Sequence, residues 1–365
     1  MTIRIGICGT GFGRRGLLLA LRHVEGAEAV AVYSRTLAHA KQAAEEFGIP
    51  QYFDDYEEML SRAAMDLVAV IAPVHLHYPI TMKAIEAGVH VLCEKPMALN
   101  TGQCAEMAKA ARQNGLTNVI DHELRFEPNR RLVKKLLDDN YIGRPYHIVV
   151  YQSTSNRADA TQPAWDWWSD ADKGGGGLGA SGSHIFDLLR WWFGEITALA
   201  GQTATWVERR LSLQTNGMLP VTSDDQWSVI AELTGGVLAA LFETRVMRHP
   251  SGPQLAITGS EGTLILDREE RLWGARTGES LHEMTVRDPH WGAPGLPLNI
   301  YSVSLVSLMR ELVDAISQQR EPRGTASFKD GMYCQAVIDA LRLSWQERHW
   351  VKPLDLLPAD ASAFE

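Results

Sequence analysis

The chain has 365 residues, of which 45% are hydrophobic and 22% are charged, so it has the balance of a folded globular protein and extensive disorder is excluded. Its 44 acidic residues outnumber its 35 basic ones, which gives a formal net charge of −9. That balance argues against nucleic acid as a partner, because phosphate binding requires a basic surface. At roughly 100 to 200 residues per domain, the length favours two or three domains.

The cysteines and the apolar runs point to a cytoplasmic protein. The four cysteines, at 8, 93, 104 and 334, are far apart and form no CxxC pair, so we expect reduced thiols and no bound metal. The first eleven residues contain no apolar stretch of signal-peptide length. The longest strongly apolar run, 67–74, is far shorter than the roughly 20 residues of a membrane span, so we expect no membrane partner.

The first 120 residues alternate strand-like and helix-like runs, which is typical of a parallel sheet covered by helices. We expect strands at 3–7, 29–33, 66–71, 89–93 and 119–121, and helices at 14–24, 38–47, 79–87 and 101–114.

From about residue 128 the pattern changes to longer alternating runs with glycine-containing turns, as in antiparallel hairpins. We expect strands at 146–153, 198–206, 227–233, 237–244, 255–259 and 263–266. Helices are expected at 128–137, 184–193, 301–319 and 328–348, and the last two are candidates to pack back on the first domain. The segment 170–179 contains four consecutive glycines and is expected to be flexible.

A glycine loop follows the first predicted strand and opens the first predicted helix. Its residues are Gly9, Thr10, Gly11, Phe12 and Gly13. In this context no Cβ blocks a pyrophosphate and the N–H groups of the helix point at it, so the loop predicts a dinucleotide site. The pattern departs from G-x-G-x-x-G, because Arg14 occupies the third glycine position. The alternative is a tight strand-to-helix turn without a ligand.

The end of the second predicted strand distinguishes the two nicotinamide cofactors. An NAD site usually places a carboxylate there to bind the ribose 2′-OH. This chain has Ser34 and Arg35 instead, and a hydroxyl beside a guanidinium suits a 2′-phosphate. We therefore expect NADP, with NAD as the alternative.

Further motifs follow the loop in order. They are Ala72-Pro73-Val74-His75-Leu76-His77, Glu94-Lys95-Pro96, Arg125-Phe126-Glu127-Pro128 and Gly182-Ser183-His184-Ile185-Phe186-Asp187. With the glycine loop, they resemble the glucose–fructose oxidoreductase and inositol dehydrogenase (Gfo/Idh/MocA) family. The resemblance implies the fold class α/β, with a Rossmann dinucleotide-binding domain at 1–122. A second domain at 123–365 would bind substrate and oligomerise through a large, mostly antiparallel open sheet.

The resemblance also implies a nicotinamide-dependent oxidoreductase acting on a sugar, a cyclitol or a related polyol, assembled as a homodimer or homotetramer. Lys95 maps to the lysine that contacts the reacting hydroxyl, and His184 maps to a proton relay that Asp187 could orient. Cofactor contacts are expected from the glycine loop, Ser34, Arg35, Ala72, Pro73, His77, Glu94 and Lys95. Substrate contacts are expected from Lys95, Arg125, Trp165, Trp168 and His184, since indole faces stack on sugar rings.

Two positions depart from the family pattern. Ala180 replaces an aspartate four residues before His184, and Glu123 replaces an asparagine, so Glu123 and His122 could belong to an altered pocket. Because alanine cannot exchange a proton, one alternative is a cofactor-binding regulator without turnover. A second alternative is a glycoside-cleaving enzyme that uses nicotinamide transiently, without net redox change.

Overall fold

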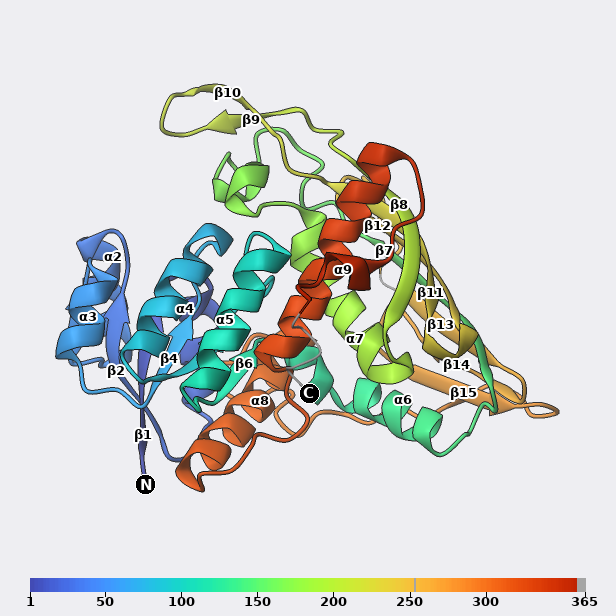
Figure 1. Cartoon of the computed structure of the whole chain (residues 1–365), viewed down its shortest axis with the longest axis horizontal. Helices are drawn as coiled ribbons and strands as arrows, with labels where there is room; N and C mark the ends of the chain where they lie inside the picture. The colour runs from blue at the N-terminus through green and yellow to red at the C-terminus, as the bar shows by residue number, and fades with distance from the viewer. Residues whose placement is uncertain (253, 360–365) are drawn as a thin grey trace. The chain divides into compact units, whose positions relative to one another are not determined.

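The computed structural model, shown in Figure 1, describes residues 1–252 and 254–359. Its chain divides into two compact units. Unit 1 contains Met1–Glu127 and Asp288–Met332, and unit 2 contains Pro128–Arg287 and Tyr333–Pro358. The division falls inside helix α9 (Phe328–Glu347). The predicted domains at 1–122 and 123–365 were divided by their expected roles in binding cofactor and substrate, not by packing. They stay a prediction.

Unit 1 is built on a six-stranded parallel sheet with the strand order of a Rossmann fold, β3-β2-β1-β4-β5-β6. The strands are β1 (Ile3–Cys8), β2 (Ala27–Tyr33), β3 (Gln51–Phe53), β4 (Leu67–Val70), β5 (His90–Cys93) and β6 (Asn118–Ile120). All four residues of β4 are buried, because helices cover both faces of a parallel sheet, which explains its continuous apolar run. The predicted Rossmann fold is confirmed.

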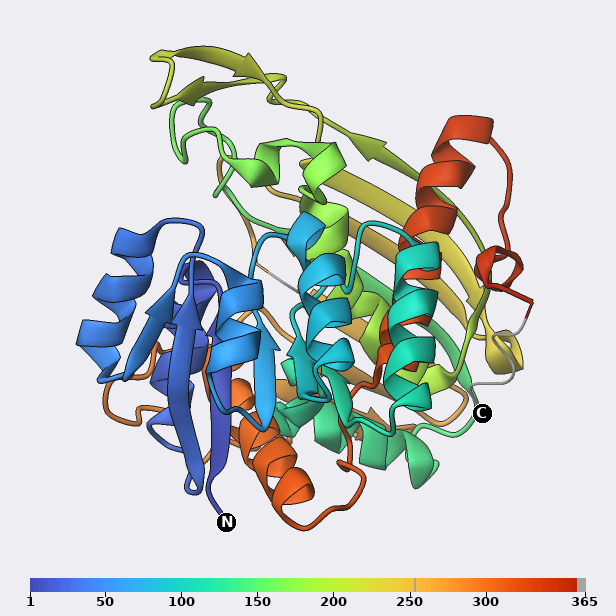
Figure 2. The same ribbon diagram turned by 60° about the vertical axis from the view of Figure 1, so that its left-hand side comes forward.

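Helices cover this sheet, and one of them comes from the far end of the chain. They are η1 (Gly13–Leu17), α1 (Leu18–Leu21), α2 (Leu37–Phe47), α3 (Tyr56–Arg62), α4 (His77–Glu86), α5 (Thr101–Gln113) and α8 (Ile300–Ser317). Figure 2 shows α8 alongside the strands, and its Leu305 and Met309 share one buried core with Ile5 and Leu17. The first of the two C-terminal helices therefore completes the core of unit 1.

Unit 2 contains an eight-stranded sheet in the order β16-β15-β14-β13-β7-β12-β11-β8. Its strands are β7 (Pro145–Ser153), β8 (Ile196–Ala204), β11 (Gln226–Leu233), β12 (Leu238–Thr244), β13 (Gln254–Gly259), β14 (Gly262–Leu266), β15 (Leu272–Arg276) and β16 (His282–Glu283). Every neighbouring pair is antiparallel except β7 and β12. The predicted mostly antiparallel sheet is confirmed. A separate small hairpin pairs β9 (Arg209–Ser212) with β10 (Gly217–Pro220).

Helices α6 (Pro128–Asp138) and α7 (Ser183–Phe193) also belong to unit 2. Helix α7 packs on one face of the sheet, where the rings of Phe186 and Trp227 have centroids 5.6 Å apart. The C-terminal part of α9 reaches β8, where the N–H of Gly201 donates to Ser344 Oγ at 3.2 Å. None of the described helices has the length and hydropathy of a membrane span.

The glycine-rich segment at 170–179 is packed, not loose. A Cβ on Gly175 would lie 2.1 Å from the carbonyl oxygen of Trp168. Gly176 has a φ of +117°, and its Cβ would lie 2.3 Å from a carboxylate oxygen of Asp224. Since Gly175, Gly176 and Gly177 are buried, the glycines allow a close approach of backbone and side chain, and the expectation of a flexible segment is wrong.

Candidate active site

The glycine loop combines one glycine that the fold requires with one that faces open space. Gly9 has a φ of +121°, and a Cβ there would lie 2.2 Å from the carbonyl oxygen of Ile71 at the end of β4. Gly11 is exposed, and a Cβ there would have no neighbour within 4 Å among the described residues. Gly11 therefore leaves room above the start of the helix, as the close approach of a pyrophosphate requires.

The departure from G-x-G-x-x-G has a structural reason. The Arg14 guanidinium does not crowd the loop, because it bonds to Glu46 and, at 3.1 Å, to Gln42 on α2. The close-packed glycine is Gly16, whose Cβ would lie 2.5 Å from the Phe12 ring. The glycine that allows close packing therefore lies two positions further along the helix than the pattern places it.

The residues predicted to distinguish the cofactors lie beside this loop. Thr10 Oγ1 donates to Ser34 Oγ at 3.3 Å, which joins the glycine loop to the end of β2. Arg35 is exposed directly after Ser34. The nearby Asp55 is used elsewhere, since its Oδ1 accepts the N–H groups of Glu57 and Glu58 at the start of α3.

His77 links two loops of the predicted site. Its Nδ1 lies 3.0 Å from the carbonyl oxygen of Pro96, and its Nε2 lies 2.8 Å from that of Ala72. The ring is fully buried, which lowers the pKa of His77 to about 4, so the imidazole is neutral at pH 7. Ala72 and Pro73 are half-buried. The geometry therefore lets His77 support a cofactor through the two loops that it joins.

Lys95 lies directly after β5, at the same carboxyl edge of the sheet as the glycine loop. The backbone holds this segment: the N–H of Glu94 donates to the carbonyl of Val70 at 2.9 Å, and the N–H of Lys95 donates to Glu94 Oε2 at 3.0 Å. On the neighbouring strand, the N–H of Asp121 donates to the carbonyl of Cys93 at 2.8 Å. Two carboxyl groups and one ammonium group thus follow two adjacent strands.

Burial dominates the electrostatics of these carboxyl groups. It raises the pKa of Asp121 well above its usual range, the charges of Glu123 and Glu94 act in the same direction, and the Lys95 ammonium opposes them. Burial also raises the pKa of Glu94, again against the effect of Lys95. The cation predicted to be catalytic is therefore surrounded by carboxyl groups that burial holds toward their neutral form.

Sequence reasoning missed Asp121 as a site residue. We expected only the end of a strand there, although the residue's position carried a signal. Ligands of open α/β sheets bind beyond the carboxyl ends of the strands, and a charged residue directly after the apolar pair Val119-Ile120 stands at that place.

Arg125, predicted to contact substrate, is buried in unit 1. Its Nη1 donates to the carbonyl of Thr325 at 3.0 Å, and its Nη2 lies 3.2 Å from Asp330 Oδ1. These contacts tie the turn η3 (Glu123–Phe126) to the segment that begins α9. Its contact with substrate stays a prediction.

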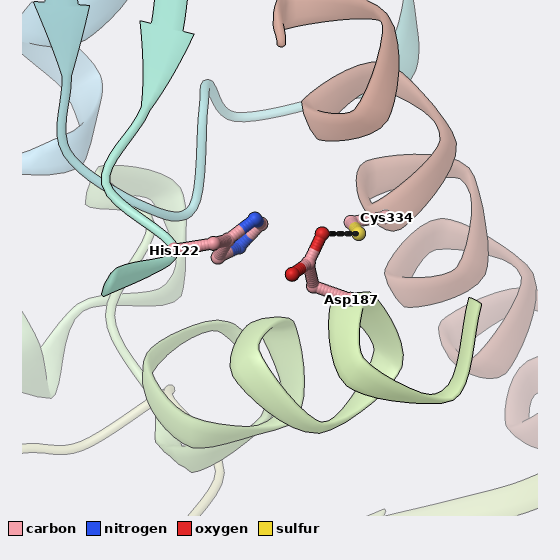
Figure 3. A group of neighbouring side chains, drawn as sticks. All are labelled: His122, Asp187 and Cys334. Carbon is pink, nitrogen blue, oxygen red and sulfur yellow. Dashed lines mark hydrogen bonds between the residues drawn. The ribbon is translucent and has the colours of Figure 1, made fainter. Parts of the chain in front are cut away.

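In unit 2, His184 lies in the first turn of α7 and is only 5% exposed. Asp187 follows one turn later, as the spacing indicated. Figure 3 shows the Asp187 carboxylate directed at Cys334 on α9, whose Sγ lies 4.0 Å from Oδ1. That Asp187 orients His184 stays a prediction.

Around the alanine at 180, hydrogen bonds attach the turn η6 (Leu178–Gly182) to the large sheet. Ser181 Oγ donates to Glu243, and Glu243 also accepts Trp227 Nε1 at 3.0 Å. Arg245 Nε lies 2.9 Å from the other oxygen of Glu243. Burial raises the pKa of Glu243, and Arg245 opposes that effect. This carboxylate is structural, since its oxygens are used to hold η6 in place.

The two tryptophans predicted to contact substrate have different surroundings. Trp168 is only 9% exposed, and the guanidinium carbon of Arg157 lies 3.9 Å from its ring centroid. Trp168 is therefore as buried as a core residue, and its contact with substrate stays a prediction. Trp165 is half-buried, and its Nε1 donates to the carbonyl of Pro220 at 2.9 Å. Contact with a sugar stays a prediction for Trp165.

Comparisons with known proteins agree with this geometry. Residues 3–122 match the oxidoreductase family with an NAD-binding Rossmann fold, and residues 131–265 match the GFO/IDH/MocA C-terminal domain. The chain is similar to an uncharacterized oxidoreductase of Synechocystis sp., with 32% identity over 97% of both chains. It is also similar to D-apiose dehydrogenase of Paraburkholderia graminis, with 26% identity over 98% of this chain and 91% of that protein.

Among solved structures, a levoglucosan dehydrogenase in complex with NADH and L-sorbose has the same fold, with a TM-score of 0.88 and 22% identity over 97% of this chain and 100% of that one. The family models together cover more than half of the chain, and the glycine loop and Glu94-Lys95-Pro96 both lie within the first matched range. The chain belongs to the Gfo/Idh/MocA family of oxidoreductases, whose N-terminal domain is an NAD-binding Rossmann fold.

Proposed function

We propose that this protein is an NAD(P)-dependent dehydrogenase or reductase that interconverts a hydroxyl and a carbonyl group on a sugar, a cyclitol or a related polyol. The position of Lys95 carries the proposal: it follows β5 at the sheet edge that also holds the glycine loop. The similarity to D-apiose dehydrogenase supports a sugar as the substrate class.

A bound nicotinamide would accept or donate the hydride. The chain's own contribution is electrostatic, because the ammonium of Lys95 would stabilise negative charge on the reacting oxygen. His184 would assist the proton transfer at the hydroxyl group, a role that suits an imidazole near neutral pH. The glycine loop would hold the pyrophosphate, and Ser34 and Arg35 would favour the 2′-phosphate of NADP over NAD.

The test uses the purified protein with NADP, then NAD, and a panel of sugars, cyclitols and polyols. We expect the absorbance of reduced nicotinamide to rise with at least one compound and to rise faster with NADP. Tight dinucleotide binding without turnover on the whole panel would favour the regulator. Release of the leaving group from a glycoside, with the amount of oxidised cofactor unchanged, would favour the glycoside-cleaving enzyme.

A further inference from the structure

Asp121 is a buried carboxyl group at the carboxyl end of β6. Its side chain is 1% exposed, and neither carboxyl oxygen accepts a hydrogen bond from a described residue. Leaving a buried polar group in this state is costly, so each such group requires an explanation. The carboxyl group of Glu94 is its neighbour: the N–H of Asp121 donates at 2.8 Å to the carbonyl of Cys93, the residue before Glu94, and each carboxyl group affects the pKa of the other.

Two carboxyl groups form a hydrogen bond only when one of them carries a proton. A single proton shared between Glu94 and Asp121 removes the repulsion of two buried charges and gives Asp121 its missing bond. The pair then carries one negative charge, which balances the ammonium of Lys95. The arrangement is built into the fold, because β5 and β6 are paired at Cys93 and Ile120, directly before these residues.

We infer that Glu94 and Asp121 share one proton, and that this pair accepts a second proton through Lys95 when the substrate hydroxyl is oxidised. The inference rests on the proposed function. It assigns Asp121 a positioning role, since it acts through Lys95 and not on the substrate. It also gives the chain a buried carboxyl acceptor in a sequence where alanine occupies position 180.

The O–H bond of the substrate breaks, and its proton forms an N–H bond on Lys95 as Lys95 passes one of its own protons to the carboxyl pair. The C–H hydrogen leaves the substrate carbon with its electron pair for the oxidised nicotinamide, which leaves a carbonyl group. The pair, now doubly protonated, later releases one proton to water. In reduction every transfer runs in reverse.

Among the described residues, the titratable groups that act on the pair are the Cys93 thiol of β5, Lys95 after β5, His122 before η3 and Glu123 in η3. The test replaces one carboxyl group of the pair at a time by the corresponding amide, in Asp121→Asn and in Glu94→Gln. The matched control is Asp66→Asn, which removes a carboxylate that binds Arg4 before β4, at the opposite edge of the same sheet. Hydride transfer is followed in a single turnover across pH, with dinucleotide binding measured separately.

We expect the wild-type oxidation rate to fall at acid pH, because both carboxyl groups of the pair are then already protonated and cannot accept another proton. Asp121→Asn should lose this pH dependence and react about 100-fold more slowly, the low end for losing a proton-transfer group. Glu94→Gln should likewise lose the pH dependence of the rate, and Asp121→Asn should retain dinucleotide binding. Asp66→Asn should keep the wild-type profile. An Asp121→Asn rate equal to wild type at every pH would overturn the inference.

A second readout needs no turnover. The folded pair holds a proton that the unfolded chain releases, so its contribution to stability should fall as pH rises above about 4, the usual pKa of an aspartate. Between pH 5 and 8 the urea midpoint of the wild type should therefore fall relative to that of Asp121→Asn, and the contribution of His77, which both proteins share, cancels in this difference. Equal pH dependence in both proteins would overturn the shared proton. If no polyol reacts but the midpoints differ, the proposed function fails and the carboxyl pair stands.

Discussion

At the scale of single residues, Lys95 and His184 differ in what their loss should cost. A fixed ammonium acts directly on the charge that develops at the reacting oxygen. Lys95→Ala should therefore abolish measurable turnover on a confirmed substrate, while dinucleotide binding survives. His184→Ala should leave a slow rate, about 100-fold below wild type, because a proton can still reach water.

The measurement is steady-state turnover combined with a fluorescence titration of reduced nicotinamide. Lys83→Ala, which removes an exposed lysine that pairs with Glu86 on α4, is the matched control and should react normally. Near-native turnover by Lys95→Ala would show that the hydride-transfer site lies elsewhere.

Arg35 should decide between the cofactors. It is exposed after β2, beside the Ser34 hydroxyl that bonds to Thr10. Losing hydrogen bonds from a guanidinium to a phosphate costs about 1.5 to 3 kcal/mol. Arg35→Ala should thus weaken NADP binding about 10- to 150-fold and leave NAD binding nearly unchanged, as measured by calorimetric titration. Equal losses for both cofactors would contradict a 2′-phosphate contact.

At the scale of elements, the glycine loop separates folding from binding. Gly11→Ala adds a Cβ into open space, so the free energy of unfolding should change by no more than about 0.5 kcal/mol. The affinity for the dinucleotide should fall at least about tenfold. Gly9→Ala adds a Cβ against Ile71 at a φ that disfavours alanine, so it should destabilise the fold. Urea unfolding and cofactor titration of both variants test this. A Gly11→Ala variant that binds normally would show that the pyrophosphate does not approach there.

The buried imidazole of His77 should make the free energy of unfolding depend on pH. The folded pKa of about 4 lies below the unfolded value of about 6.5, so the folded state binds fewer protons in that interval. Stability is then fully present above pH 6.5 and is lost as pH falls toward 4, by roughly 3 kcal/mol at most. His77→Gln should flatten this part of the urea midpoint curve, whereas His39→Gln, at an exposed histidine of α2, should not. A curve unchanged by His77→Gln would disprove the assignment.

Elements with strong periodicity could be predicted from the sequence, and short ones could not. Strands such as β4 and β11 and helices such as α5 and α8 lie within a few residues of the expected ranges. The short elements β3, α3, β9, β10 and β16 were not predicted, since two to seven residues carry little periodicity. β15 was missed as well, because Gly274 interrupts its five residues.

The site shows the same division. The glycine loop, Ser34 and Lys95 belong to local motifs and could be identified by sequence alone. Asp121 could not be identified in this way. It matters because it is buried and because β6, which it follows, pairs with β5, which Glu94 follows. The contact between His77 Nδ1 and the carbonyl oxygen of Pro96 likewise depends on tertiary packing.

At the scale of the whole molecule, the outer face of the large sheet carries an unusual apolar row. It is opposite to the face where Trp227 packs on Phe186. Direct strand pairing places seven residues side by side: Ala200, Ile230, Ala240, Val149, Ala256, Ile265 and Trp273. Ile230 and Val149 are 52% and 44% exposed. Contiguous exposed apolar surface of this kind usually marks an interaction site.

A second copy of the chain is the partner that we expect on this row, since antiparallel sheets with one apolar outer face can bury it by pairing two copies around a two-fold axis. The protein should therefore have at least the mass of a dimer at micromolar concentration in light scattering. Ile230→Glu places a charge in the centre of the row and should shift the mass toward that of a monomer, because burying an unpaired carboxylate is strongly unfavourable. Gln113→Glu, which adds the same charge on the exposed side of α5, should leave the mass unchanged. A wild-type protein that scatters as a monomer, or an Ile230→Glu variant that keeps the wild-type mass, would show that this face is not the interface.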